Sequence, residues 1–250
     1  MRRLWLAAAL FTVAGGAMAQ IGQHRTDFAL GFGGGYVLSN VGFTPKVTQG
    51  LQNGLVGGLA MRYVCEKYFN TIASVMMEVN YAQVGWKEDI LTSNDEPVIN
   101  TVTGLPEEYS RRLNYVQVPF FAHLAWGRER SGCNFFFQAG PQFGVFLNES
   151  SKSNFKYEEA NMKERTNHNI AQDSMKVENT FDYGIAAGLG MEYSAKHVGH
   201  FLIEARYYFG LGNIYGASKK DYFSKSNIGN IVFKLTYLFD LKKTNNPKIR

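Results

Sequence analysis

The sequence predicts an all-β fold, an eight-stranded antiparallel up-and-down transmembrane β-barrel with long extracellular loops and short periplasmic turns. Three observations carry this prediction. Apolar residues alternate with small or polar residues in about eight segments, as in strands with two unlike faces. The apolar face is large and aromatic while the other carries glycine and charge, which suits lipid outside and a polar lumen inside. The connections alternate between long and short, as in barrels with both chain ends on the periplasmic side.

The first residues have the three parts of a secretory signal peptide. Two arginines follow Met1, an apolar run ends at Ala14, and an Ala-x-Ala signal ends at Ala19, so cleavage is expected between Ala19 and Gln20. No later segment has the roughly 20 consecutive apolar residues of a transmembrane helix, so strands must carry any membrane crossing. The expected divisions are 1–19 (signal peptide), 20–241 (outer-membrane barrel) and 242–250 (basic periplasmic tail).

The charge balance argues against a nucleic-acid partner. The chain has 26 Lys and Arg against 21 Asp and Glu, a net charge of +5, and removal of the two leader arginines leaves 24 against 21, or +3. So weak a bias does not create a basic binding surface. The tail 242–250 is interpreted as a solvated end, with binding to anionic head groups as the alternative.

The first and last strands have matching patterns. In 28–38 bulky residues alternate with alanine and glycine, so the inner face is nearly all small, as a narrow barrel requires. The two strands are expected to pair, because an open sheet edge is not tolerated in hydrocarbon. The last strand, 228–241, has a lipid-facing side formed by Ile231, Phe233, Leu235, Tyr237 and Phe239.

The other strands follow from the same alternation. Each has the length of about 9 to 13 residues that a tilted crossing needs. The strands are predicted at 55–63, 74–86, 114–126, 134–147, 181–193 and 201–209. The long connections are 39–53, 87–110, 148–179 and 212–226, and the short turns are 66–70, 127–132 and 194–199.

Charged residues fall on the inward faces of these strands. A buried ion without a partner is costly, so these residues are expected to form a polar network that fills the barrel. A barrel of eight strands usually has an interior filled by side chains, and conduction or proton relay is the alternative. The residues of this network are Arg62, Glu78, Glu192, Glu204, Arg206 and Lys234, with Glu78 facing the last three near mid-depth and Arg62 and Glu192 near the periplasmic end.

The chain shows no signature of catalysis or of a cofactor. Cys65 and Cys133 allow a disulfide in an exported protein, with free thiols as the alternative, and their spacing is not that of a zinc site. An acyl-transfer enzyme needs a nucleophile within reach of a base. His123 has no Ser or acidic partner at a matching depth and His200 flanks a turn, so no catalytic, cofactor-binding or metal-binding residue is predicted.

Four short stretches carry a family resemblance. They are 114–119 (NYVQVP), 139–144 (AGPQFG), 182–190 (DYGIAAGLG) and 206–211 (RYYFGL). They resemble the PorT-like outer-membrane β-barrel family of Bacteroidetes, and the resemblance extends over nearly the whole mature chain. It implies a place in the outer membrane of a Gram-negative bacterium, with both termini periplasmic, and no family catalytic residues.

The function expected from these observations is that of a non-enzymatic accessory or interaction protein, linked through the resemblance to type IX protein secretion. A small-solute porin or channel is the first alternative, and a lipid-modifying outer-membrane enzyme is the second. The expected partners are outer-membrane lipid and lipopolysaccharide and other secretion-system proteins, with no nucleic acid. The oligomeric state is left open by the sequence.

Overall fold

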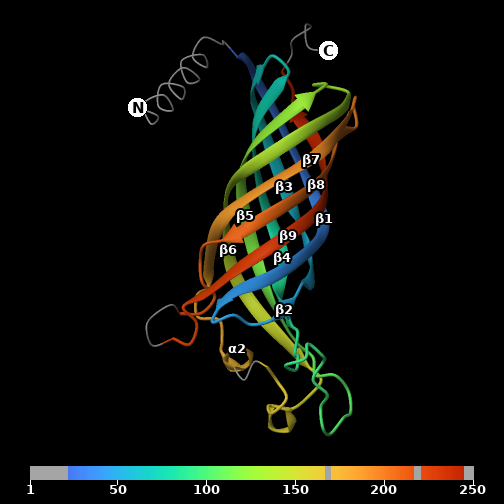
Figure 1. Ribbon diagram of the computed structural model, residues 1–250. Helices are drawn as coiled ribbons and strands as arrows, with labels where there is room; N and C mark the ends of the chain where they lie inside the picture. Colours follow the sequence, from blue (N-terminus) through green and yellow to red (C-terminus); the bar gives the residue numbers. More distant parts are fainter. Residues whose placement is uncertain (1–21, 167–169, 217–220, 245–250) are drawn as a thin grey trace, which may run out of the picture.

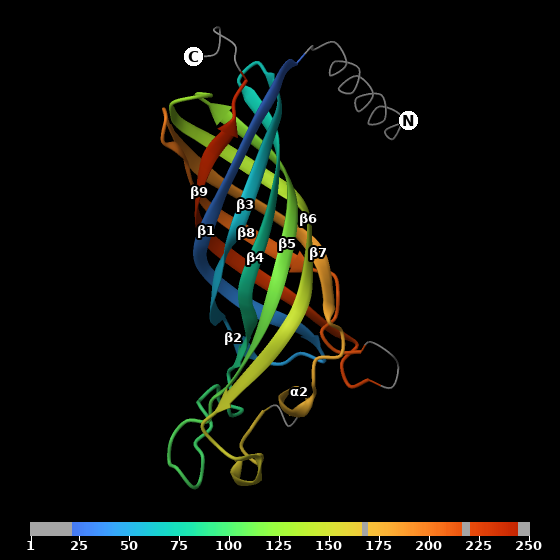
Figure 2. The same cartoon turned by 180° about the vertical axis from the view of Figure 1, so that it is seen from behind.

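The chain forms a closed, tilted barrel of long strands in a computed structural model that describes residues 22–166, 170–216 and 221–244 (Figures 1 and 2). The predicted signal peptide 1–19, its expected cleavage site at Ala19 and Gln20, and most of the tail lie outside the described residues. The elements are β1 (Gln23–Thr44), β2 (Gln49–Gly50), β3 (Gln52–Tyr68), β4 (Thr71–Glu88), β5 (Tyr109–Gly127), β6 (Gly132–Ser153), the short 3-10 helix η1 (Tyr157–Glu159), α2 (Ala171–Ser174), β7 (Phe181–Ala195), β8 (Gly199–Gly210) and β9 (Lys225–Lys242).

The first and last long strands close the ring. β1 pairs with both β3 and β9, and β4 pairs with both β3 and β5, so the neighbours run β3-β1-β9-β8-β7-β6-β5-β4 and return to β3. Of the nine strands β2 pairs only with β4, which leaves eight in the ring. All pairings are antiparallel. The structure therefore confirms the predicted eight-stranded antiparallel up-and-down barrel.

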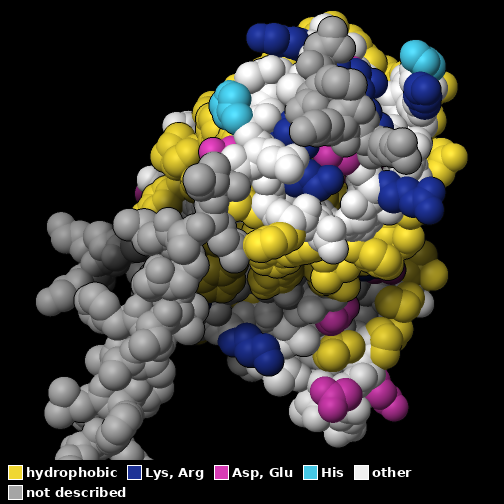
Figure 3. Space-filling model, turned by 90° about the horizontal axis from the view of Figure 1, so that it is seen from above, with side chains coloured by type: hydrophobic (Ala, Val, Ile, Leu, Met, Phe, Trp, Pro, Cys, Tyr) yellow, Lys and Arg dark blue, Asp and Glu magenta, His cyan; other side chains and the backbone are white. Residues whose placement is uncertain are grey.

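The two ends of the barrel differ. At the turn end, which carries both ends of the described chain, short connections join β3 to β4, β5 to β6 and β7 to β8 (Figure 1). At the loop end, long segments leave β4, β6 and β8 and include α2 and η1 (Figure 2). Seen from the turn end, hydrophobic side chains cover the flank of the barrel and Lys and Arg side chains lie on its rim (Figure 3).

Several strands are longer than their alternation indicates. β1 begins five residues before the predicted 28–38 and ends six residues after it. β6 continues through Ser153 rather than ending at 147. The extensions at 23–27 and 148–153 are polar, so hydrophobic alternation does not mark them, although their backbones still pair with a neighbour. No helix in the described part of the chain is long and apolar enough to cross a bilayer.

The alternation of residue size along β1 has a steric reason. Gly31 and Gly35 face inward where β1 lies against β9, and a Cβ atom at either position would overlap the carbonyl oxygen of Tyr237 or Phe233. Glycine therefore permits the close approach of the strands that complete the ring. On the outer face of β1, by contrast, Phe32 and Tyr36 are exposed, as expected for a lipid-facing wall.

The two cysteines are free thiols, so the disulfide that the sequence allows between Cys65 and Cys133 is absent. Cys65 lies on β3 and Cys133 on β6, and β4 and β5 separate these strands around the ring. Adjacent strands lie about 4.8 Å apart. Three such steps exceed the Cα separation of under about 7 Å that a disulfide needs.

Candidate functional site

Four buried charges meet in the middle of the barrel, and we call them the charge core: Glu78, Glu204, Arg206 and Lys234. Lys234 Nζ on β9 donates to Glu78 Oε2 on β4 at 2.8 Å, and Arg206 Nη1 on β8 donates to the same oxygen at 3.1 Å. Arg206 also lies 3.6 Å from Glu204. The structure thus places Glu78 opposite the two cations across the lumen, and two acids balance two bases.

Neutral side chains complete the charge core. Asn80 donates to Glu78 at 2.7 Å and accepts from Lys234 at 3.1 Å, while Gln138 donates to Glu204 at 2.6 Å. The guanidinium of Arg206 lies 5.1 Å from the ring centre of Phe121, a favourable cation–π contact. Such partners offset part of the cost of burying ions. The hydrogen bonds and ion pairs of the charge core and its neutral neighbours crosslink β4, β6, β8 and β9.

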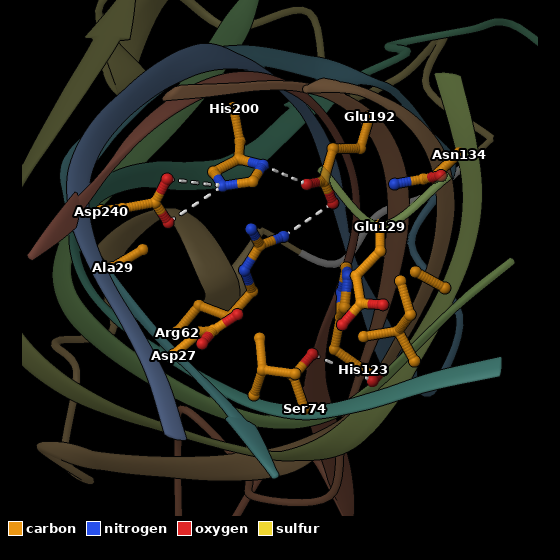
Figure 4. A pocket seen from close by; sticks show the side chains of 13 residues that line it. Asp27, Ala29, Arg62, Ser74, His123, Glu129, Asn134, Glu192, His200 and Asp240 are labelled. Atoms are coloured by element: carbon orange, nitrogen blue, oxygen red, sulfur yellow. Dashed lines mark hydrogen bonds and ion pairs between the residues drawn. The ribbon is translucent and has the colours of Figure 1, made fainter. Parts of the chain in front are cut away.

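A second polar group lies nearer the turn end (Figure 4). Arg62 Nη1 on β3 donates to Glu192 Oε2 on β7 at 2.6 Å, as the sequence placed both residues near that end. The imidazole of His200 on β8 lies between Glu192, 2.7 Å from its Nδ1, and Asp240, 3.0 Å from its Nε2. Lys243 adds an ion pair to Asp240 at 2.8 Å. This turn-end network therefore joins β3, β7, β8 and β9.

Ser194 brings a hydroxyl to the same imidazole, a contact that the sequence did not predict. Its Oγ lies 2.8 Å from His200 Nδ1 and donates to Glu192 Oε1 at 3.1 Å. Ser, His and Asp thus meet, but both ring nitrogens face carboxylates, and an imidazolium is the form that satisfies both. A general base needs a free ring nitrogen directed at the nucleophile, which this arrangement does not provide.

The space beside this network is small. A cavity of about 30 Å³ is lined by Arg62, His123, Asn134, His200 and Asp240, among others (Figure 4). Pockets for small organic ligands have volumes of about 300 Å³ or more. The cavity accommodates about one water molecule, not a lipid or a sugar. Among the described residues no group of His, Cys, Asp or Glu has the arrangement of a metal site.

The loop end is closed by aromatic packing. Phe43 contacts Trp86, Tyr215 and Phe223, with ring centres 5.3, 6.2 and 4.8 Å away. All four rings are buried, and the guanidinium of Arg111 lies 5.6 Å from the centre of the Trp86 ring. These side chains come from β1, β4, β5 and the segment between β8 and β9, so they fill the mouth where a channel would open.

Polar contacts fold the loops onto this aromatic layer, and we call the assembly of 89–108, 154–166 and 170–180 the loop-end cap. Arg165 donates to Glu107 at 3.0 and 2.6 Å, and both side chains are buried. Gln172 of α2 donates to Glu88 Oε1 at 2.9 Å, and its carbonyl accepts from Arg111 at 2.9 Å. The cap is therefore an ordered part of the protein.

Two acidic groups of the cap have shifted affinities for protons. Burial and the neighbouring Glu88 raise the pKa of the Asp173 carboxyl to about 8. Burial acts in the same direction on Glu107, but hydrogen bonds from Asn161, Asn100 and Arg165 outweigh it and lower the pKa of that carboxyl. One carboxyl of the cap thus holds a proton near neutral pH, and the other stays ionised.

The outer face of β9 lies where the sequence placed it. Phe233, Leu235 and Phe239 are exposed, and Ile231 and Tyr237 are partly covered by neighbouring rings and strands. The inward-facing residues that the sequence prediction missed lie an even number of positions from inward-facing residues that it found on the same strand. Ser194 follows Glu192 by two positions, and His200 precedes Glu204 by four. Strand alternation alone could therefore have added Ser194 and His200 to the inward set, and Asp240, already on the polar face of the last strand, to the predicted network.

A family model described as an outer membrane protein beta-barrel domain matches residues 18–216. The chain belongs to this family. Membership in the outer-membrane barrel family assigns the protein to the outer membrane, in agreement with the lipid-suited wall described above. The description of this family does not specify the PorT-like branch that the sequence resembles. No match was found among curated proteins.

Solved structures similar to this barrel come from several bacteria. Ail of Yersinia pestis, in complex with the heparin analogue sucrose octasulfate, is 14% identical, with 87% of this chain and 99% of that chain covered and a TM-score of 0.32. OprG of Pseudomonas aeruginosa is 13% identical, with 87% and 98% covered and a TM-score of 0.39. Neisserial surface protein A is 9% identical, with 85% and 97% covered and a TM-score of 0.39. Similarity at this level carries no functional information.

Proposed function

We propose that this protein is a closed, non-enzymatic outer-membrane barrel that acts as an accessory or interaction protein through its loop-end cap. In this proposal the cap faces the exterior of a Gram-negative cell, and the turn end with both termini faces the periplasm. Outer-membrane lipid and lipopolysaccharide surround the wall. The observation that carries the proposal is an ordered cap on a filled barrel, because rigid scaffolds commonly present recognition on such connections.

The filled interior supports this function over a channel. The charge core occupies the middle of the lumen, and the rings around Phe43 occupy the mouth. Planar-bilayer recording of the full chain is expected to show no steady conductance. Steady single-channel currents would instead favour the small-solute porin.

The tip of the first long loop supports a protein partner. Ile99, Val102 and Leu105 are exposed apolar residues at this tip, beyond the lipid-facing wall. Asn100 holds the tip in place, since its Oδ1 accepts from the N–H groups of Val102 and Thr103 at 3.0 Å and its Nδ2 donates to Glu107. Exposed apolar residues on an ordered, water-facing segment are typical of interaction sites.

A photo-crosslinking pair tests this assignment. Val102 in the cap and Leu189 on the wall are equally exposed, at 66%. With a benzophenone amino acid at either position in living cells, Val102 is expected to yield protein adducts and Leu189 lipid adducts. Lack of any protein adduct from Val102, with lipid adducts intact at Leu189, would contradict a role for the cap in binding.

From the resemblance to PorT-like barrels, we propose that the protein acts in type IX protein secretion. It is supported by the four motifs in 114–119, 139–144, 182–190 and 206–211. Deletion of the gene is then expected to reduce delivery of type IX cargo to the cell surface, with recovery on complementation. Unaltered delivery would exclude this setting but leave a cap partner, as read by Val102 crosslinking, intact.

A further inference from the structure

At the loop end, β6 extends beyond the end of its pairing with β7, while it stays paired with β5. It pairs with β7 only as far as Val145, opposite Phe181. Its pairing with β5 continues to Ser153, opposite Tyr109. The stretch 147–153 therefore has a partner strand on one side only, and we call its other side the β6 edge.

The other strand extensions at this end are covered. Beyond its pairing with β3, the Val41 backbone donates to and accepts from the side-chain amide of Gln49, at 3.1 and 2.6 Å. The end of β4 is covered by β2. On β9, the Ser226 N–H donates to Asn213 Oδ1 at 2.8 Å, and its carbonyl accepts from Ile214 N–H at 2.9 Å. At these three places the protein pairs the backbone of a strand edge with its own groups.

The β6 edge has no such cover in the part of the chain that the structure describes. Within the described residues, no backbone group of 147–153 bonds to anything outside the β5–β6 ladder, and every residue there except Glu149 is exposed. Seven residues at about 3.3 Å each give a row of roughly 23 Å. The side chains are polar from Asn148 to Ser153, so the edge lies in water, since open backbone is not tolerated in hydrocarbon.

We propose that the β6 edge accepts an extended segment of another protein as an added strand. The alternate N–H and C=O groups of such an edge match only a second extended backbone, which makes β-strand addition the favoured mode. Glu149 is engaged by Arg111 at 2.6 Å, whereas Lys152 makes no ion pair in the described part of the chain. The segment that binds is therefore expected to be polar and to carry an acidic residue opposite Lys152. The inference rests on the proposed interaction function and adds a mode of binding to it.

Hydrogen exchange of the full chain in phosphatidylcholine nanodiscs measures the edge directly. In the free protein, alternate amides of 147–153 are expected to exchange fast and the intervening amides, which face β5, slowly. The probe is the capped peptide Thr-Val-Thr-Asp-Thr-Val-Thr-Asp, and the control is the same peptide with proline for each valine. At saturation the first peptide is expected to slow the fast amides about tenfold, the equivalent of one hydrogen bond each, and the control to leave them unchanged.

Two adjacent variants locate the effect. N–H groups of adjacent residues in a strand point to opposite sides, so of Ser150→Pro and Ser151→Pro one removes a donor of the β6 edge and the other a ladder bond to β5. The first is expected to abolish protection by the peptide while leaving the β5-facing amides slow. The second is expected to make the end of the β5–β6 ladder exchange faster.

Three outcomes would overturn the inference. Slow exchange at all amides of 147–153 in the free protein would mean that the edge is already covered. Protection that depends on protein concentration and not on peptide would identify a second copy as the occupant. Equal protection by both peptides, or by neither, would exclude strand addition. None of these results alters the Val102 crosslinking test, so failure here and failure of the proposed function are distinguishable.

Discussion

The charge core and the loop-end cap are both buried polar networks, but they balance charge differently. In the charge core, Glu78 lies against two cations, and the four groups are neutral as a set. In the cap, the Asp173 carboxyl lies beside Glu88, a like charge. A balanced set of charges crosslinks the wall permanently. Two adjacent carboxyls hold together only while they share a proton, so a rise in pH can loosen the cap.

Removal of the central acid is expected to have the largest effect. Glu78→Ala leaves Lys234 and Arg206 buried without their shared carboxylate, and breaking a buried pair costs about 3–5 kcal/mol. Urea unfolding of the reconstituted barrel, followed by its gel mobility without boiling, measures the loss. Glu158→Ala, at an exposed position of the cap, is the control and is expected to change stability by less than about 0.5 kcal/mol. Similar losses for both variants would show that the charge core does not stabilise the barrel.

The second largest loss of stability is expected on the outer wall beside the charge core. Leu235 is adjacent to Lys234 but faces outward and is exposed. Leu235→Lys is expected to cost about 2–4 kcal/mol in the same unfolding assay, because the new charge would lie in hydrocarbon near the midplane. Leu241→Lys, outward but at the turn end, should cost about 0–1 kcal/mol. Equal costs would show that Leu235 is not at membrane depth.

The cap is expected to loosen as pH rises. A free Asp side chain has a pKa near 3.9, whereas the closed cap raises that of Asp173 to about 8, so closing the cap binds a proton. Stability of the closed cap is therefore full below about pH 4, falls between about pH 4 and 8, and is constant above. Amide exchange of α2, corrected for intrinsic rates, should be at least about tenfold faster at pH 9 than at pH 5.

Asp173→Asn separates this titration from other effects of pH. The amide cannot ionise beside Glu88, so the variant is expected to lose the dependence of α2 exchange on pH while the charge core stays unaffected. An unchanged pH profile in the variant would assign the loosening to another group of the cap.

Loss of the buried hydroxyl is expected to have the smallest effect. Ser194→Ala removes one hydrogen bond to Glu192 and one contact with His200, worth about 1 kcal/mol of stability. Because Ser194 is placed in a structural network, lipid A from cells that carry the variant should have the same mass spectrum as wild type. A changed lipid A spectrum would reveal catalysis at Ser194 and contradict a non-enzymatic barrel.

Alternation predicted the ring well because each inward position is marked by its neighbours in sequence. Glu204, Arg206 and Lys234 were assigned to the interior from the parity of two strands, and all three are buried there. The same rule could not show that β6 continues to Ser153 or that β1 begins at Gln23. Outside the apolar band both faces of a strand meet water, so period two disappears from the sequence.

The sequence by itself determined the fold class, the two faces of each long strand and the set of charges in the lumen, because these depend on local period and on the cost of charge in lipid. The sequence predicted that Glu78 faces Arg206 and Lys234, but only the tertiary structure showed that both cations donate to the same Glu78 oxygen across the closed ring. It also decided that His200 joins Ser194 to Asp240 and that polar loops fold into a cap. Strand stagger around a barrel sets those depths, and no single strand encodes it.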